Sequence, residues 1–132
     1  YGVMHRNTFL RSPDILSRNY ALSAQPLFRF AGQLTGVEGY MESAASGMVA
    51  AIGLSKALRG EEEPDFGGQT VLGALERHVR TPSSDFQPMN ANFGILDALP
   101  MRVKGKRDRY AKLSARALEA LDAIIDQYEL RN

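Results

Sequence analysis

The stretch from Leu27 to Leu58 constrains the fold of this chain more than any other. It reads LFRFAGQLTGVEGYMESAASGMVAAIGLSKAL: an apolar run, a glycine-rich turn and a long segment of small residues. The apolar run favours a strand over Leu27–Ala31. The segment after Gly39 favours a helix to Leu58, with Gly60 as a stop signal just beyond it. We therefore expect a strand that passes through glycines into a helix.

This junction has two interpretations. The first turn of a helix carries unpaired backbone N–H groups at the positive end of the helix dipole, which suit an anionic or electron-rich ligand. A strand that simply runs into a helix gives the same pattern, and small residues allow a helix to pack closely on its neighbours. The pattern alone leaves a ligand site and plain architecture both open.

The remaining segments predict mostly helices and a few short strands. We expect a strand over Gly2–Met4, a brief helix beginning at Ser12-Pro13-Asp14 and an extended piece over Tyr20–Ala24. The run EEEPDFGG is a solvated linker by composition.

Two more helices follow this linker. Thr70 is a cap for a helix from Val71 to Val79 or Arg80. The segment 82–100 is too apolar for a disordered linker and too rich in proline for a long helix, which predicts an ordered loop pressed on the body. The last helix should span about Arg107 to Glu129, with an apolar stripe formed by Tyr110, Leu113, Ala117, Leu121, Ile124 and Tyr128.

Length and composition narrow the class of protein. A chain of 132 residues is about the size of one domain, and 44% apolar with 23% charged residues is typical of a soluble globular protein. No apolar run approaches the ~18 residues of a spanning helix and no secretory pattern is visible, so we expect no membrane insertion and a cytoplasmic location. The first residue is Tyr1 rather than Met, which suggests a piece of something longer or a trimmed chain.

Several kinds of chemistry lack the residues they need. The chain has no cysteine, which excludes disulfides, thiolate catalysis and cysteine metal sites within it. Its histidines, His5 and His78, lie far apart in sequence, so no metal motif is visible. No nucleophile stands beside a base. We therefore predict neither catalytic nor metal-binding residues in this chain, although the polar cluster His5, Arg6 and Asn7 is able to face a ligand.

Charge is unevenly distributed along the chain. The net charge is only +1, but residues 101–112 carry six basic side chains and one acid. This run is either a solvated helix end or a surface for a polyanion such as RNA. The candidate RNA-binding residues are Lys104, Lys106, Arg107, Arg109 and Lys112.

Three blocks of sequence together resemble one family. They are YGVMHRNT at 1–8, FAGQLTGVEGY with ESAA at 30–45, and FQPMNANFG at 86–94. In this order they are similar to the C-terminal third of the folate- and FAD-dependent tRNA (uracil-5-)-methyltransferases, and the likeness covers essentially the whole chain. These flavoproteins make 5-methyluridine in the T loop of tRNA from methylenetetrahydrofolate, with reduced FAD and with NAD(P)H as reductant. The glycine turn alone would also fit the related glucose-inhibited division protein A flavoproteins, which modify wobble uridine.

The resemblance implies an α/β fold, the C-terminal fragment of a Rossmann-like, glutathione-reductase-type FAD-binding domain. It implies that residues 1–100 belong to that domain and that 101–132 form a basic segment and an amphipathic helix packed on it. The positive helix start would face the flavin, and His5, Arg6 and Asn7 would lie near the folate. The expected flavin contacts are Gly32, Gln33, Thr35, Gly36, Val37, Glu38 and Gly39.

Two features of the family are missing from this sequence. It has neither an N-terminal G-x-G-x-x-G turn for the FAD pyrophosphate nor the family's catalytic cysteines. We therefore expect a fragment that is inactive alone and is completed by a missing N-terminal part or by self-association. A flavin-free RNA-binding or interaction module and an inert gene fragment are the alternatives.

Overall fold

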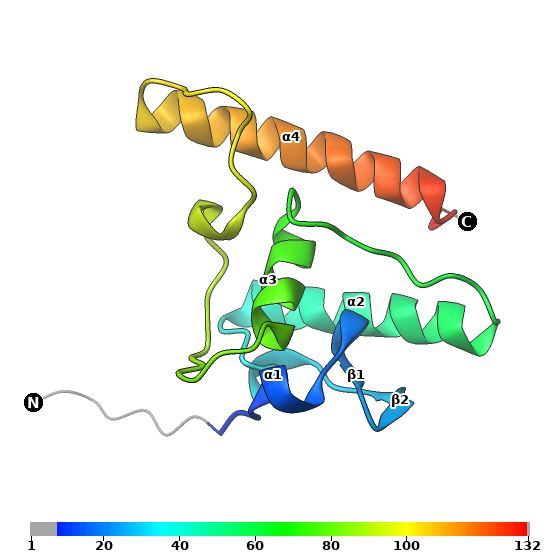
Figure 1. The fold of residues 1–132 in the computed structure, drawn as a ribbon. Coiled ribbons are helices and arrows are strands. Elements are labelled where there is room, and N and C mark those ends of the chain that lie inside the picture. Colours follow the sequence, from blue (N-terminus) through cyan, green and yellow to red (C-terminus); the bar gives the residue numbers. More distant parts are fainter. Residues whose placement is uncertain (1–7, 132) are drawn as a thin grey trace, which may run out of the picture.

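This computed structural model describes residues 8–131. They form helices and a small hairpin that are joined by loops (Figure 1). The hairpin and the short helices precede α2, and α3 and α4 follow it. The elements in chain order are α1 (Ser12–Ile15), the 3₁₀ turn η1 (Arg18–Tyr20), β1 (Ala21–Leu22), β2 (Gln25–Arg29), the 3₁₀ turn η2 (Gly32–Thr35), α2 (Tyr40–Leu58), α3 (Val71–Arg80), the 3₁₀ turn η3 (Phe93–Ile95) and α4 (Lys106–Gln127).

The helices lie where the sequence predicts them. The helix after Gly39 runs to Leu58, and the last helix differs from its predicted bounds by one or two residues at each end. Thr70 caps α3 as expected, because its Oγ1 accepts a hydrogen bond from the Gly73 N–H at 3.0 Å. Local signals therefore determine these helices.

The strand β2 lies two residues earlier than predicted, at Gln25–Arg29 instead of Leu27–Ala31. It pairs antiparallel with β1, which occupies the centre of the predicted extended piece, and Ala21 lies opposite Arg29. The described residues thus confirm a mixed helix and strand class, with one two-stranded sheet. The predicted strand Gly2–Met4 lies outside the described residues.

Burial along β2 is the reverse of what side-chain polarity suggests. The apolar Leu27 and Phe28 are 58% and 63% exposed, whereas the Arg29 side chain is only 5% exposed. Arg29 is buried because its guanidinium donates to both carboxylate oxygens of Glu63, at 2.8 and 2.9 Å. The hairpin therefore presents an apolar surface to solvent and an ion pair to the interior.

The core forms where α2, α3 and the loop after α3 meet. Val37, Val49, Val79 and Phe86 are buried there in one cluster. A second cluster joins Ala74 of α3, Leu96 of the loop and Leu113 of α4. Figure 1 shows α4 lying across the N-terminal end of α3. The loop 82–100 is thus ordered and pressed on the body, as predicted.

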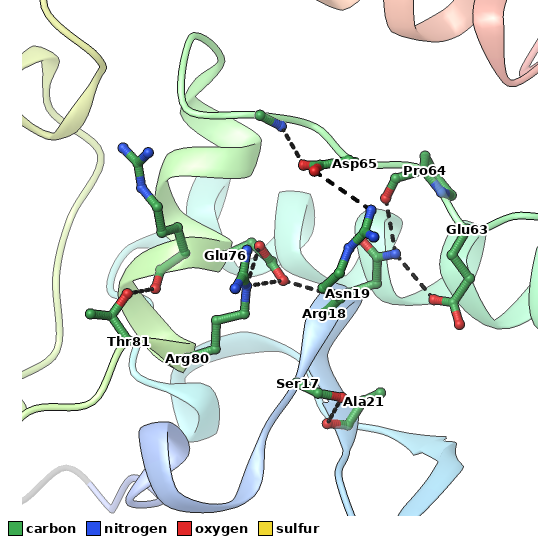
Figure 2. Close-up of polar contacts among 12 residues, drawn as sticks. Ser17, Arg18, Asn19, Ala21, Glu63, Pro64, Asp65, Glu76, Arg80 and Thr81 are labelled. Atoms are coloured by element: carbon green, nitrogen blue, oxygen red, sulfur yellow. Dashed lines mark hydrogen bonds and ion pairs between the residues drawn. The ribbon is translucent and has the colours of Figure 1, made fainter.

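The segment EEEPDFGG is not the solvated linker that its composition predicts. Pro64 and Phe66 are buried, and the carbonyl of Pro64 accepts from the Asn19 side-chain amide at 3.1 Å. Figure 2 shows Asn19 between this segment and Glu76 of α3, whose carboxylate accepts from the Asn19 N–H at 3.0 Å. These bonds hold Asn19 at a φ of 53°, in the left-handed region that asparagine tolerates.

Candidate functional site

The turn between β2 and α2 satisfies most of its own backbone groups. The Gly32 N–H donates to Ser46 Oγ at 2.7 Å, and the Gly36 N–H donates to the Gln33 carbonyl at 3.0 Å. The Glu38 N–H donates to the Met89 carbonyl at 2.9 Å. These three N–H groups are therefore already paired, whereas the predicted free N–H groups are those at the start of α2, which has no side-chain cap.

Three of the seven candidate flavin contacts are buried inside the turn. Thr35 and Val37 are fully buried, and Thr35 Oγ1 donates to the Gly32 carbonyl at 2.8 Å. Gly36 adopts a φ of 96°, and a side chain there would overlap the Phe86 ring. These three residues shape the turn: the Thr35 and Val37 side chains are buried, and the Phe86 ring lies against Gly36.

Other candidates face a hollow at the start of α2. Gln33 and Gly39 line it together with Tyr40 and Ser43, and it encloses about 330 Å³. Gly39 is the residue before α2, with a φ of 111° and no side-chain cap. The hollow therefore combines an amide, a hydroxyl and the positive end of a 19-residue helix.

Glu42 closes one side of this helix start. Its Oε1 accepts from the Ala91 N–H at 2.9 Å, and its carboxylate lies against Gly39. The bond from the Ala91 N–H, together with the Glu42 N–H and the Asn90 amide, lowers the pKa of Glu42 below its ordinary value. The dipole of α2 is therefore already partly compensated by a carboxylate of this chain.

The second and third sequence blocks meet at this site. Val37 and Met89 form a parallel bridge, and the Met89 N–H donates to the Gly36 carbonyl at 2.9 Å. The Asn90 side chain adds a bond to the Glu38 carbonyl at 2.8 Å. The sequence predicted no ligand-site role for Ser46 or Asn90; Asn90 belongs to the third block, whereas Ser46 directly follows the second.

The segment that follows the first block reaches the same turn. The Leu10 N–H donates to the Leu34 carbonyl at 2.8 Å, and Ser12 Oγ donates to the Thr35 carbonyl at 2.6 Å. His5, Arg6 and Asn7 lie outside the described residues. Segments that are far apart in the sequence therefore converge on residues 34–42.

The candidate RNA-binding residues all lie at or before the first turns of α4 and are exposed. Within residues 8–131 none of them forms an ion pair. Lys106 Nζ and Arg109 Cζ lie 5.4 and 5.6 Å from the centre of the Tyr110 ring. This end of α4 therefore offers several cations to an anionic partner.

Other kinds of site find no support among the described residues. No group of three acidic, histidine or cysteine side chains there is placed to hold a metal ion. His78 Nε2 lies 2.8 Å from the Gln87 carbonyl, and its ring packs on Phe86, so it has a structural role. Nor is any helix in the described range both long and apolar enough to cross a membrane.

Comparison with known proteins gives consistent results. Residues 1–62 match the family model described as glucose inhibited division protein A. The chain is 50% identical over 124 residues to the methylenetetrahydrofolate–tRNA-(uracil-5-)-methyltransferases TrmFO of Staphylococcus aureus strains Newman, Mu3 and USA300 / TCH1516. That alignment covers 92% of this chain but only 28% of each relative. Over most of its length the chain is therefore similar to one part of the methylenetetrahydrofolate–tRNA-(uracil-5-)-methyltransferases, and its first 62 residues are similar to the glucose inhibited division protein A family.

Proposed function

We propose that this chain is one part of a flavoprotein that methylates uridine at C5 in the T loop of tRNA. The proposal is supported by the contacts that the third block and the segment after the first block make with residues 34–42, together with 50% identity to relatives named as tRNA methyltransferases. In this proposal residues 1–100 belong to a glutathione-reductase-type FAD-binding domain, and 101–132 are a basic segment and a helix packed on it. The organism's cytoplasm is the expected location.

The hollow at the start of α2 fits a portion of a flavin. Gln33 and Ser43 supply an amide and a hydroxyl, and the α2 start has no side-chain cap, so backbone donors remain for carbonyl oxygens of the cofactor. Gly39 adds no side chain of its own to the hollow, and the Glu42 carboxylate lies on one side of the same helix start. When bound, the reduced flavin supplies the hydride for the transferred carbon.

The other candidates support this site indirectly. Thr35, Gly36 and Val37 fix the turn, and Glu38 joins it to Met89 and Asn90. We place His5, Arg6 and Asn7 near the folate by resemblance alone. The residues Lys104, Lys106, Arg107, Arg109 and Lys112 form the proposed contact with the tRNA backbone.

The reactive thiols of the family have no counterpart in this sequence, which has no cysteine. We therefore propose that the chain contributes contacts to cofactor and tRNA, and that the thiols, the pyrophosphate-binding glycines and the NAD(P)H site belong to another polypeptide or segment. Self-association through the exposed face of the hairpin is a second way to complete the fold.

The test is to purify the chain, titrate it with FAD and assay methyl transfer from methylenetetrahydrofolate to unmodified tRNA. We expect weak flavin binding that Gln33→Ala and Ser43→Ala reduce and Gln87→Ala, an exposed control, does not. We expect no methyl transfer. Stoichiometric flavin with turnover would overturn the proposal that the chain is incomplete.

A flavin-free RNA-binding module is the second candidate, favoured by the exposed and unpaired cations of α4 in the described residues. It predicts salt-dependent tRNA binding by a preparation that takes up no FAD. Flavin binding that depends on Gln33 would exclude it.

A further inference from the structure

A large hollow in the described part of the molecule lies away from the turn between β2 and α2. It encloses about 710 Å³ where the loop before α4 folds back along the first turns of that helix (Figure 1). Pockets of this size hold small organic ligands and single nucleotides. Its lining includes Phe93, Arg102, Lys104, Arg109, Tyr110 and Leu113.

The interior of the hollow is aromatic and apolar. Phe93 and Tyr110 lie with their ring centres 4.6 Å apart and tilted by 40°, and Leu113 is buried beneath them. Both rings are half-buried, so each keeps part of its surface toward the hollow. Aromatic surface of this kind binds a nucleobase by stacking, whatever its sequence.

The rim of the hollow is cationic. Arg102, Lys104 and Arg109 line it, and none of its lining residues is acidic. Arg109 also lies over the Tyr110 ring, which places a planar guanidinium beside the aromatic surface. Inorganic phosphate would contact the cations of the rim but not the apolar interior, whereas a nucleotide would contact the rim with its phosphate and the interior with its base.

The walls are held in place by bonds to the rest of the molecule. Arg116 of α4 donates to the carbonyls of Asp97 and Ala98, the latter at 2.9 Å. Arg77 of α3 pairs with Asp97, also at 2.9 Å. The loop is therefore fixed to two helices, which lowers the entropic cost of binding.

We propose that this hollow binds one unpaired nucleotide of an RNA, with the base against Phe93 and Tyr110 and its phosphate on the rim. The base must be unpaired because paired bases of an RNA helix are stacked and inaccessible to side chains. The inference rests on the proposed role in tRNA modification and adds a base contact to the expected backbone contacts.

Equilibrium binding of labelled oligouridylate, compared with an abasic oligomer of equal length and charge, tests the proposal. We expect the base-bearing oligomer to bind about tenfold more tightly. Phe93→Leu removes the aromatic ring and should bring this affinity ratio close to one. Phe93→Tyr keeps an aromatic ring and should keep the ratio near tenfold. Lys112→Gln, on α4 but outside the hollow, should weaken both oligomers and leave their ratio unchanged.

A second measurement needs no variant. Irradiation of the unaltered chain with oligouridylate that carries 5-iodouridine should yield crosslinks at Phe93 or Tyr110. Equal binding of the two oligomers, or crosslinks that all map outside the hollow, would overturn the base site.

Uridine monophosphate, titrated under the same conditions as the oligomer, distinguishes a site for free nucleotides from a site for RNA. If uridine monophosphate binds as tightly as the oligomer, the RNA assignment is overturned. FAD titration of the same preparation tests the proposed function independently.

Discussion

The Arg29 guanidinium and the Glu63 carboxylate form a two-pronged ion pair across 34 residues of sequence, at 2.8 and 2.9 Å. Arg29 Nη1 also lies 3.3 Å from the Asn19 carbonyl, so the pair joins β2, η1 and the segment after α2. Because β2 leads directly into the candidate flavin-facing turn, this pair fixes where that turn begins.

Removing the charge of Glu63 should destabilise the fold. Glu63→Gln leaves the nearly buried guanidinium without a carboxylate, so we expect the free energy of unfolding to fall by about 2 kcal/mol. Urea denaturation measures this change in the free energy of unfolding. Glu62→Gln, at the exposed neighbouring position, should change stability by less than about 0.5 kcal/mol. Equal effects of the two changes would show that the ion pair contributes nothing specific.

Stability should also decrease in acid. The Arg29 guanidinium holds the pKa of Glu63 below its usual 4.5, and Lys56 does the same for Glu61. Carboxylates with a lowered pKa in the folded state stabilise it fully above the unfolded value, and this contribution is lost as pH falls through the folded value. Urea midpoints should therefore fall as the pH drops below 4.5, and Glu63→Gln should flatten that dependence. If the urea midpoint of Glu63→Gln depends on pH in the same way as that of the unaltered chain, Glu63 does not contribute to the loss of stability in acid.

Gly36 should tolerate no side chain. Its φ is 96° and a Cβ would overlap the Phe86 ring, so Gly36→Ala should cost about 3 kcal/mol through strain and displaced packing. Gly60 has a φ of 69° but no atom within 4 Å of an added Cβ. Gly60→Ala is the matched control, with an expected cost of about 1 kcal/mol from backbone strain alone. Thermal melts of both variants should separate the two contributions.

Asn90 should hold the loop 82–100 on the candidate flavin-facing turn. Asn90→Ala removes the bond to the Glu38 carbonyl and should cost about 1 kcal/mol locally. Hydrogen exchange at the Glu38 and Met89 amides should then become faster, because these amides join the two segments. Gln87→Ala, whose side chain bonds only to nearby Asp85, should leave both rates unchanged. If hydrogen exchange at the Glu38 and Met89 amides is unchanged in both variants, the Asn90 side chain is not needed to hold the loop on the turn.

The exposed face of the hairpin should drive self-association. Leu27 and Phe28 are more than half exposed on a strand that has one partner in the described sheet. We expect Phe28→Gln to lower the apparent mass in sedimentation velocity at high concentration. Leu58→Gln, at an equally exposed position at the end of α2, is the control. A chain that is monomeric at every concentration would remove this route to completing the fold.

The sequence predicted α2, α3 and α4 well because their signals are local. The Thr70 cap and the regular apolar spacing of α4 act within a few residues, so no distant partner is needed to interpret them. The position of β2 was predicted less well, since the apolar run Leu27–Ala31 does not reveal which residues β1 pairs with.

Burial and the candidate site depended on tertiary structure. Arg29 is buried and Phe28 is exposed because Glu63 lies 34 positions away in sequence and close in space. Within the glycine turn, only the fold separated Gln33 and Gly39, which line a hollow, from Val37, which is fully buried. By itself the sequence determined the helices and the family resemblance. The tertiary structure decided which of the candidate residues line a hollow and which are buried, because exposure depends on contacts between segments that local patterns do not encode.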